Sequence, residues 1–270
     1  MDSYQFFKLS LAHKVAHVQL NRPEKLNAMN QAFWTEIKQI FAWVAETPEV
    51  RAVVISGEGK HFSAGIDLQM FAGFAAKFAK DAGRNARLLR ATIQDLQSSL
   101  SAVENCSKPV LAAIHGYCIG GAVDLIAACD MRYCAADAVF SIKEVDIGMA
   151  ADVGTLQRLP HIIGDGVMRE LAYTARDFDA TEAKQIGLVN QVYPDHATLL
   201  EQVLALAATI ASKSPIAIEG TKEMIRYARD HSVADGLNYI ATWNAAMLQA
   251  DDLKQAMAAQ MMKQQPEFKD

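Results

Sequence analysis

The sequence predicts an α/β core followed by a helical C-terminal region. Short apolar runs typical of buried strands occur at Ala52–Ser56 and Pro109–Ile114. Between them, from about residue 85 to residue 103, apolar residues recur every three or four positions, as in an amphipathic helix. We expect residues 1–195 to form the core and residues 196–270 to form the helical region.

The N-terminal part alternates strand and helix patterns. Tyr4–Leu9 and Lys14–Leu20 have the pattern of two strands joined in a hairpin. An amphipathic helix is predicted from Asn30 to about Glu46, and Gly57 closes the buried strand that follows it.

The middle of the chain continues this alternation around a turn that contains several glycines. The strand at Pro109–Ile114 leads through His115–Gly121 into an apolar helix predicted at Ala122–Ala128. Further strands are predicted at Met131–Cys134 and Val139–Ile142.

The C-terminal part carries helix start and stop signals. Asp179–Glu182 has the pattern of a capping segment, and Gly187 is a stop signal. Pro215 opens a helix at the first-turn position where proline is tolerated. The stretch from about residue 234 to residue 264 is predicted to be helical and is apolar on more than one side. Such a stretch favours packing between subunits.

Composition narrows the class of protein. A chain of 270 residues, 51% of them hydrophobic, is long enough to bury a full core. The net charge of −5 argues against a nucleic-acid partner, which requires clustered Lys and Arg. No apolar run approaches the roughly 18–20 residues of a membrane span, and the start of the chain shows no targeting pattern. The sequence therefore predicts a cytoplasmic enzyme without a nucleic-acid or membrane partner.

The cysteines and histidines do not form a metal-binding pattern. The four cysteines show neither CxxC nor zinc-type spacing, and most lie among apolar residues, where Cys packs as a small hydrophobe. The seven histidines are scattered and include no HExxH motif. We expect no metal site.

Two loops that follow buried strands carry a family resemblance. These loops are His61–Leu68 and Gly116–Asp124. Together with Asn21–Pro23 and Lys108–Val110, they resemble the signature segments of the crotonase (enoyl-CoA hydratase/isomerase) family. The resemblance implies a crotonase-like spiral of ββα units with a C-terminal trimerisation region. It also implies an acyl-CoA substrate, a homotrimer or dimer of trimers, and no cofactor beyond the coenzyme A of the substrate.

The two loops suit the stabilisation of a thioester enolate. Removing the weakly acidic α-proton requires hydrogen-bond donors for the oxygen that becomes negative. Gly121 opens the apolar helix, so its N–H lacks an intrahelical acceptor, and Ile66 follows Gly65 in a loop that can approach a ligand closely. By position in the family motif, the N–H groups of Ile66 and Gly121 should form the oxyanion hole. The resemblance implies substrate contacts at Ser63, Ala64, Gly65, Ile66, Asp67 and Gly121.

Three acidic residues indicate which reaction of the family is catalysed. Asp124 ends the second loop, and Glu144 and Asp152 follow it along the chain. Hydratases of the family usually place Glu at both of the first two positions and a glycine near the third. The triplet found here resembles the dienoyl-CoA isomerases, which implies conversion of 3,5-dienoyl-CoA to 2,4-dienoyl-CoA in fatty acid β-oxidation.

The chemistry of this conversion explains two separated carboxyl groups. A proton leaves C2 and another joins C6, several bonds away, so one group acts as base and another as acid. We expect Glu144 to be the base and Asp152, partly desolvated, to be the acid. We also expect Asp124 to be a catalytic residue: it is shorter than Glu, which leaves room where a hydratase would hold water, and it orients the other two carboxyl groups. The reverse assignment of Glu144 and Asp152 stays open.

Each feature also has a plain structural interpretation. Taken alone, the glycine pair before the apolar helix marks a tight turn, and Asp67 or Asp152 could cap a helix. Glu144 alone would be a surface residue of a strand. Rival functions are an enoyl-CoA hydratase, a Δ3-Δ2-enoyl-CoA isomerase, or a non-catalytic binding or scaffold protein on the same fold.

Overall fold

The computed structural model describes residues 4–70, 73 and 78–270. Within these residues, a larger sheet has the strand order β1-β2-β3-β4-β6-β9. Its strands are β1 Phe7–Ala12, β2 Val15–Leu20, β3 Ala52–Gly57, β4 Val110–Ile114, β6 Met131–Ala135 and β9 Gln191–Tyr193. β1 pairs antiparallel with β2, and the other pairs are parallel. A second sheet joins β5 Tyr117–Ile119, β7 Val139–Ser141 and β8 Phe178–Asp179.

Helices connect and cover the strands. The α-helices are α1 Gln31–Glu46, α3 Ala82–Asn105, α4 Gly121–Ala127, α5 Thr155–Arg158, α6 Asp165–Thr174, α7 Ala180–Gln185, α8 His196–Ala211, α9 Pro215–Tyr227, α10 Val233–Met247 and α11 Asp251–Met261. Short 3-10 helices occur at η1 Pro23–Lys25, η2 Glu144–Ile147 and η3 Leu159–His161. The predicted α/β core with a helical C-terminal region is confirmed.

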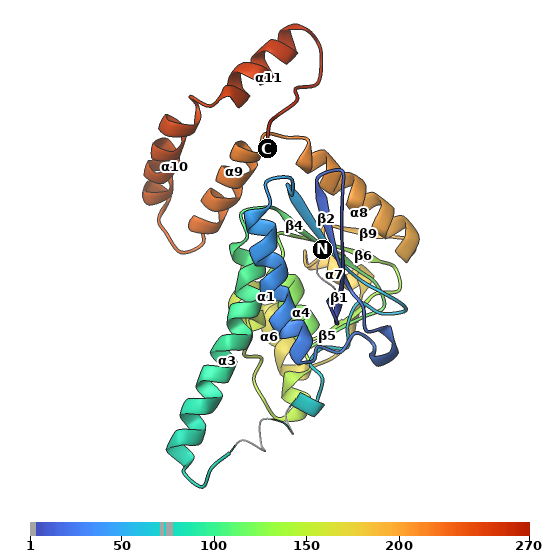
Figure 1. The fold of residues 1–270 in the computed structure, drawn as a ribbon. Coiled ribbons are helices and arrows are strands. Elements are labelled where there is room, and N and C mark those ends of the chain that lie inside the picture. The colour runs from blue at the N-terminus through green and yellow to red at the C-terminus, as the bar shows by residue number, and fades with distance from the viewer. Residues whose placement is uncertain (1–3, 71–72, 74–77) are drawn as a thin grey trace.

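Both faces of the larger sheet are covered, which explains why its central strands are apolar throughout. Val53 and Ile55 of β3 belong to the main core, to which α1, α3 and α4 contribute. Val54 points to the other face, where it belongs to a second cluster with Leu199 and Val203 of α8. Figure 1 shows α8 lying along the strands. Burial of each Val or Leu side chain contributes roughly 1.5–3 kcal/mol to the free energy of folding, so the layers on both faces stabilise the sheet.

The first hairpin is shifted from its predicted position. The prediction of Tyr4–Leu9 placed the first strand too early, since β1 runs from Phe7 to Ala12. The two residues between the strands, His13 and Lys14, have φ values of 51° and 64°. Two successive residues with positive φ make the tight turn that matches the twist of a hairpin. This short turn allows both strands to extend to residues 12 and 15.

The C-terminal region consists of one helix on the sheet and three beyond it. α9, α10 and α11 extend away from the core, as Figure 1 shows. The single stretch predicted from residue 234 to residue 264 is in fact two helices, α10 and α11. Ala250 has an extended backbone before the acidic first turn of Asp251 and Asp252, which favours a new helix start.

Within the described residues, no single helix is long and apolar enough to cross a membrane. α8 and α9 meet that criterion only as a pair, across a bend of 107°.

The fold places the two sequence motifs side by side. β3 and β4 are neighbouring parallel strands, so the loops that follow them leave the same edge of the sheet. The Ser63 N–H donates to the Tyr117 carbonyl over 2.8 Å, and the Ile119 N–H donates to the Ser63 carbonyl over 3.1 Å. These bonds fix the first loop against β5, directly before α4.

Candidate active site

A cavity of about 470 Å³ lies where the two loops meet. Most of its lining is apolar and comes from Trp34, Leu68, Phe78, Leu89, Ile93, Leu96, Ile119, Ile147, Met149 and Val153. The cavity also brings together most of the residues singled out from the sequence, namely Ala64, Gly65, Ile66, Gly121, Asp124, Glu144 and Asp152. A mainly apolar cavity with a few converging polar groups is the usual form of a small-molecule site.

The N–H groups of Ile66 and Gly121 lie close together, and neither has an acceptor among the described residues. Met29 pairs with the loop on both sides of Ile66, through its N–H to the Gly65 carbonyl and its carbonyl to the Asp67 N–H. In parallel pairing the Ile66 N–H then points away from Met29, and it has no acceptor in the part of the chain that the structure describes. Gly121 is the first residue of α4, and its N–H donates to no group among the described residues. A Cβ placed on Gly121 would stand 3.5 Å from the Ile66 nitrogen.

Gly65 has no room for a side chain. Its φ is +86°, and a Cβ there would lie 2.5 Å from the Ile119 carbonyl oxygen and 3.2 Å from the Gly121 nitrogen. Any other residue would push the two motif loops apart. The close approach of the two free donors therefore depends on glycine at this position.

Ser63 and Asp67, for which substrate contacts are predicted, hydrogen-bond to neighbouring protein groups. The buried Ser63 hydroxyl donates to the Asn27 carbonyl over 2.8 Å and accepts from the Gly65 N–H over 3.1 Å. Asp67 pairs with Arg22 over 2.7 Å, and this hydrogen bond holds the pKa of the Asp67 carboxyl below its usual value. Neither residue is among the described residues that line the cavity. Both shape the loop that presents the Ile66 N–H.

Asp124 projects from α4 and is fully buried. One carboxylate oxygen, Oδ1, accepts from the Thr155 N–H over 2.6 Å, while Oδ2 has no partner among the described residues. Burial raises the pKa of Asp124 to about 6, because loss of hydration outweighs the hydrogen bond from Thr155. A buried acid with a free oxygen is costly to keep for structural reasons alone, which favours a chemical role.

Glu144 begins the short helix η2, so it is not the surface strand residue of the alternative interpretation. Its residue exposure is only 9%, and its Oε2 has no partner among the described residues. Burial, followed by the charges of Asp124 and Asp152, raises the pKa of Glu144 to about 7. A carboxylate with this pKa is well suited to general base catalysis near neutral pH.

Asp152 lies on the same cavity and is half-buried. Burial raises the pKa of its carboxyl group above the usual value. Its backbone carbonyl accepts from the Gln97 side chain over 2.7 Å. The residue that caps α5 is Gly154, and the carboxylate that binds the first N–H of this helix belongs to Asp124. The helix-cap interpretation of Asp152 is therefore wrong.

Trp34 is a cavity residue that the sequence did not reveal. It belongs to the buried face of α1, where an aromatic residue is ordinarily core. Its indole N–H is buried without an acceptor among the described residues. Only the three-dimensional structure shows that Trp34 lines the cavity, because nothing in the helical pattern separates it from its packed neighbour Phe33.

Comparison with known proteins agrees with this geometry. The sequence pattern of the family described as Enoyl-CoA hydratase/isomerase matches residues 11–270. The chain belongs to this family. The crystal structure of an enoyl-CoA hydratase from Bacillus anthracis superposes with a TM-score of 0.89 at 30% identity, covering 98% of this chain and 99% of that one. The predicted crotonase fold is thus confirmed.

Several curated relatives are named as isomerases. The chain is 52% identical to the human mitochondrial Delta(3,5)-Delta(2,4)-dienoyl-CoA isomerase over 95% of this chain and 79% of that protein. It is 46% identical to the peroxisomal Delta(3,5)-Delta(2,4)-dienoyl-CoA isomerase of Arabidopsis thaliana over 99% and 98%. These names contradict the expected cytoplasmic location, because both relatives belong to organelles. Composition and the lack of an obvious targeting pattern do not report compartment, so the expectation had no physical support.

Proposed function

We propose that this protein isomerises 3,5-dienoyl-CoA to 2,4-dienoyl-CoA in fatty acid β-oxidation. The observation that carries the proposal is the convergence of Asp124, Glu144 and Asp152 on an apolar cavity. Beside them lie the N–H groups of Ile66 and Gly121, which have no acceptor among the described residues. Relatives at 52% and 46% identity bear the name of this activity. A proton shift needs only a base, an acid and a site for the enolate oxygen, and this cavity supplies all three.

The first step breaks the C2–H bond of the substrate. The thioester oxygen accepts hydrogen bonds from the N–H groups of Ile66 and Gly121, which stabilise the negative charge as it develops. Glu144 takes the C2 proton, and the electron pair of the C–H bond passes into a conjugated dienolate. The raised pKa of Glu144, about 7, makes its carboxylate a stronger base than an exposed glutamate.

The second step forms a C–H bond at C6. Asp152 gives its proton to C6, and the dienolate electrons return as double bonds at C2–C3 and C4–C5. Burial favours the protonated form of Asp152, as an acid requires. The site is reset when Glu144 loses its proton to water and Asp152 regains one. The reverse roles of Glu144 and Asp152 use the same cavity and are distinguished by isotope labelling.

The site is less suited to hydration. A hydratase must hold one water between two carboxylates, whereas Asp124 is shorter than Glu and one of its oxygens is already bound to the Thr155 N–H. Asp152 adds a third acid that hydration does not need.

We propose that the enzyme uses no metal or other cofactor. Within the described residues, no group of three or more His, Cys, Asp or Glu side chains could hold a metal ion.

We also propose a trimer-based homo-oligomer. The helices beyond the core leave many large apolar side chains exposed, including Ile225, Val233, Leu237, Leu248, Met257 and Met261. Apolar surface of this extent is characteristic of subunit interfaces. Sedimentation is expected to show three or six chains per particle, and a stable monomer at micromolar concentration would contradict it.

The activity is tested directly with 3,5-dienoyl-CoA. The expected product absorbs as a conjugated 2,4-dienoyl thioester, with and without a chelator present. Asp146→Asn is a matched control, because Asp146 lies in the same short helix as Glu144 but is exposed and pairs with Lys143. Rapid hydration of 2-enoyl-CoA, with no product from the diene, would replace this proposal with a hydratase function.

A further inference from the structure

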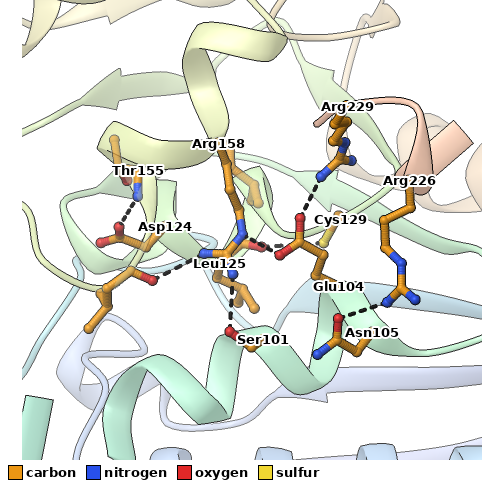
Figure 2. Close-up of polar contacts among 12 residues, drawn as sticks. Ser101, Glu104, Asn105, Asp124, Leu125, Cys129, Thr155, Arg158, Arg226 and Arg229 are labelled. Atoms are coloured by element: carbon orange, nitrogen blue, oxygen red, sulfur yellow. Dashed lines mark hydrogen bonds and ion pairs between the residues drawn. The ribbon is translucent and has the colours of Figure 1, made fainter. Parts of the chain in front are cut away.

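Arg158 does not line the cavity, but it contacts the segment that carries Asp152. Its Nη1 donates to the Val153 carbonyl over 3.2 Å, and its Nη2 donates to the Ser101 hydroxyl over 3.3 Å. A Cβ placed on Gly154 would stand 1.6 Å from Nη1, so the guanidinium lies directly against the Gly154 backbone. Figure 2 shows Arg158 between Thr155 on one side and Ser101 and Glu104 on the other.

The residues from Asp152 to Thr155 are therefore held from both sides. On the outer side, Gln97 binds the carbonyl of Asp152 and Arg158 binds that of Val153. On the inner side, the Thr155 N–H donates to Asp124 Oδ1 over 2.6 Å. A shift of this short segment would move Asp152 and the hydrogen bond of Asp124 together.

Arg158 is in turn held by Glu104 of α3. Glu104 Oε2 accepts from Arg158 Nε over 2.8 Å, and Oε1 accepts from Arg229, which follows α9 in the C-terminal region. Burial opposes ionisation of Glu104, but the two guanidinium groups outweigh it and hold the pKa of this carboxyl below its usual value. The side chains of Arg158 and Glu104 are only 12% and 20% exposed, so solvent screens the pair weakly.

We propose that Arg158 is a positioning residue for Asp124 and Asp152, and that Glu104 and Arg229 couple this positioning to the C-terminal helical region. The kinetic part of the test rests on the proposed isomerase function, whereas the structural part does not. Arg158 suits the task because its planar fork reaches the Val153 carbonyl, Ser101 and Glu104 at once.

The kinetic test compares variants of this chain of contacts. Arg158→Gln removes the charge and most of the fork, and we expect kcat to fall about 10- to 100-fold with KM nearly unchanged, as for a misplaced catalytic group. Arg158→Lys keeps the charge, so its kcat should fall less than that of Arg158→Gln. Arg229→Gln acts through Glu104, so its kcat should fall least of the three.

The structural test measures hydrogen exchange of the Thr155 amide, which needs no substrate. We expect Arg158→Gln and Glu104→Gln to exchange this amide faster than the unmodified enzyme. Arg226→Gln is the matched control, since Arg226 pairs with Asn105 and Glu223 beside the network without contacting Glu104 or Arg158. If Arg158→Gln does not fold, Arg158→Lys and Glu104→Gln carry both measurements.

The outcomes separate this inference from the proposed function. Faster Thr155 exchange together with lower kcat, in the Arg158 and Glu104 variants but not in Arg226→Gln, supports the positioning role. Unchanged exchange overturns it, whatever happens to turnover, and so does faster exchange with full turnover. An unmodified enzyme that leaves 3,5-dienoyl-CoA untouched would refute the isomerase function. In that case the exchange comparison alone would still decide whether Arg158 holds the segment.

Discussion

Glu104 and Glu144 are both largely buried, yet their environments act on them in opposite ways. Glu104 lies between Arg158 and Arg229, and its pKa is held below the usual value. Glu144 has no cationic partner among the described residues, and burial raises its pKa to about 7. The difference shows that burial alone does not assign a role to a carboxylate. Pairing makes Glu104 a fixed structural charge, whereas isolation leaves Glu144 able to exchange a proton near neutral pH.

The largest effect is expected from removing the isolated carboxylate. Glu144→Gln keeps the shape of the side chain but cannot take a proton, so turnover should fall by ~10²–10⁴. Steady-state kinetics with 3,5-dienoyl-CoA measures this loss, and the exposed neighbour variant Asp146→Asn should stay near full activity. Equal activity of both variants would mean that a buried carboxylate without a cationic partner is not a sign of a catalytic residue in this protein.

Loss of one N–H donor of the oxyanion hole should lower turnover less than loss of the Glu144 carboxylate. Gly121→Pro removes the N–H at the start of α4, and turnover should fall by roughly 10²–10³. Circular dichroism must show an intact fold, because proline also restricts Gly120 before it. A folded variant with normal turnover would remove this N–H from the mechanism.

A smaller loss is expected from crowding Glu144. A Cβ on Gly120 would lie 3.3 Å from Glu144 Oε1, and Gly120 has a φ of +53° that other residues rarely adopt. We expect Gly120→Ala to lower turnover about tenfold and stability by about 1–3 kcal/mol. Gly166→Ala is the control, because a Cβ there meets no atom within 4 Å. Similar kinetics for the two alanine variants would show that Glu144 tolerates displacement.

The pH dependence of stability sharpens the contrast between the two glutamates. The folded-state pKa of Glu144 is raised from 4.5 to about 7, so the folded state binds this proton more tightly than the unfolded state. Stability is therefore lost as pH rises between these values, by on the order of 3 kcal/mol. Thermal unfolding should show Glu144→Gln to be more stable than the unmodified protein at pH 8 and similar at pH 4.

The paired glutamate should behave in the opposite sense. The folded-state pKa of Glu104 is lowered, so its contribution to stability is present above its unfolded pKa and is lost as pH falls. Glu104→Gln should therefore be less stable than the unmodified protein at pH 8. A gain in stability for Glu104→Gln would contradict the distinction between paired and isolated carboxylates.

The sequence predicted the elements that local patterns determine. The helix after Asn30 formed as expected, and the strand predicted at Ala52–Ser56 formed with one more residue, Gly57, because capping and short apolar runs are local properties. The convergence of Asp124, Glu144 and Asp152 on one cavity followed from the family resemblance and agrees with the structure. The break between α10 and α11 was missed, since apolar residues continue on both sides of it.

The sequence could not show which acids are paired. Glu104 is as ordinary as Glu144 in sequence, and its arginine partners lie 54 and 125 positions away. For the same reason, nothing marked Ser63 and Asp67 as internal supports, because their partners Asn27 and Arg22 lie in another segment. Pairing between residues far apart in the sequence depends on the assembled fold, so the sequence alone does not predict it.

Deuterium labelling in the Asp152→Asn variant tests most directly the claim that two separated carboxyl groups move a proton from C2 to C6. In heavy water, the unmodified enzyme should place deuterium at C6 of the product. Asp152→Asn should lose ~10²–10⁴ in turnover. In this variant, Glu144 should still exchange the C2 proton of bound substrate, while no deuterium should be incorporated at C6. Loss of C2 exchange with retained entry at C6 would reverse the roles of base and acid. Full turnover with normal labelling at C6 would contradict the account.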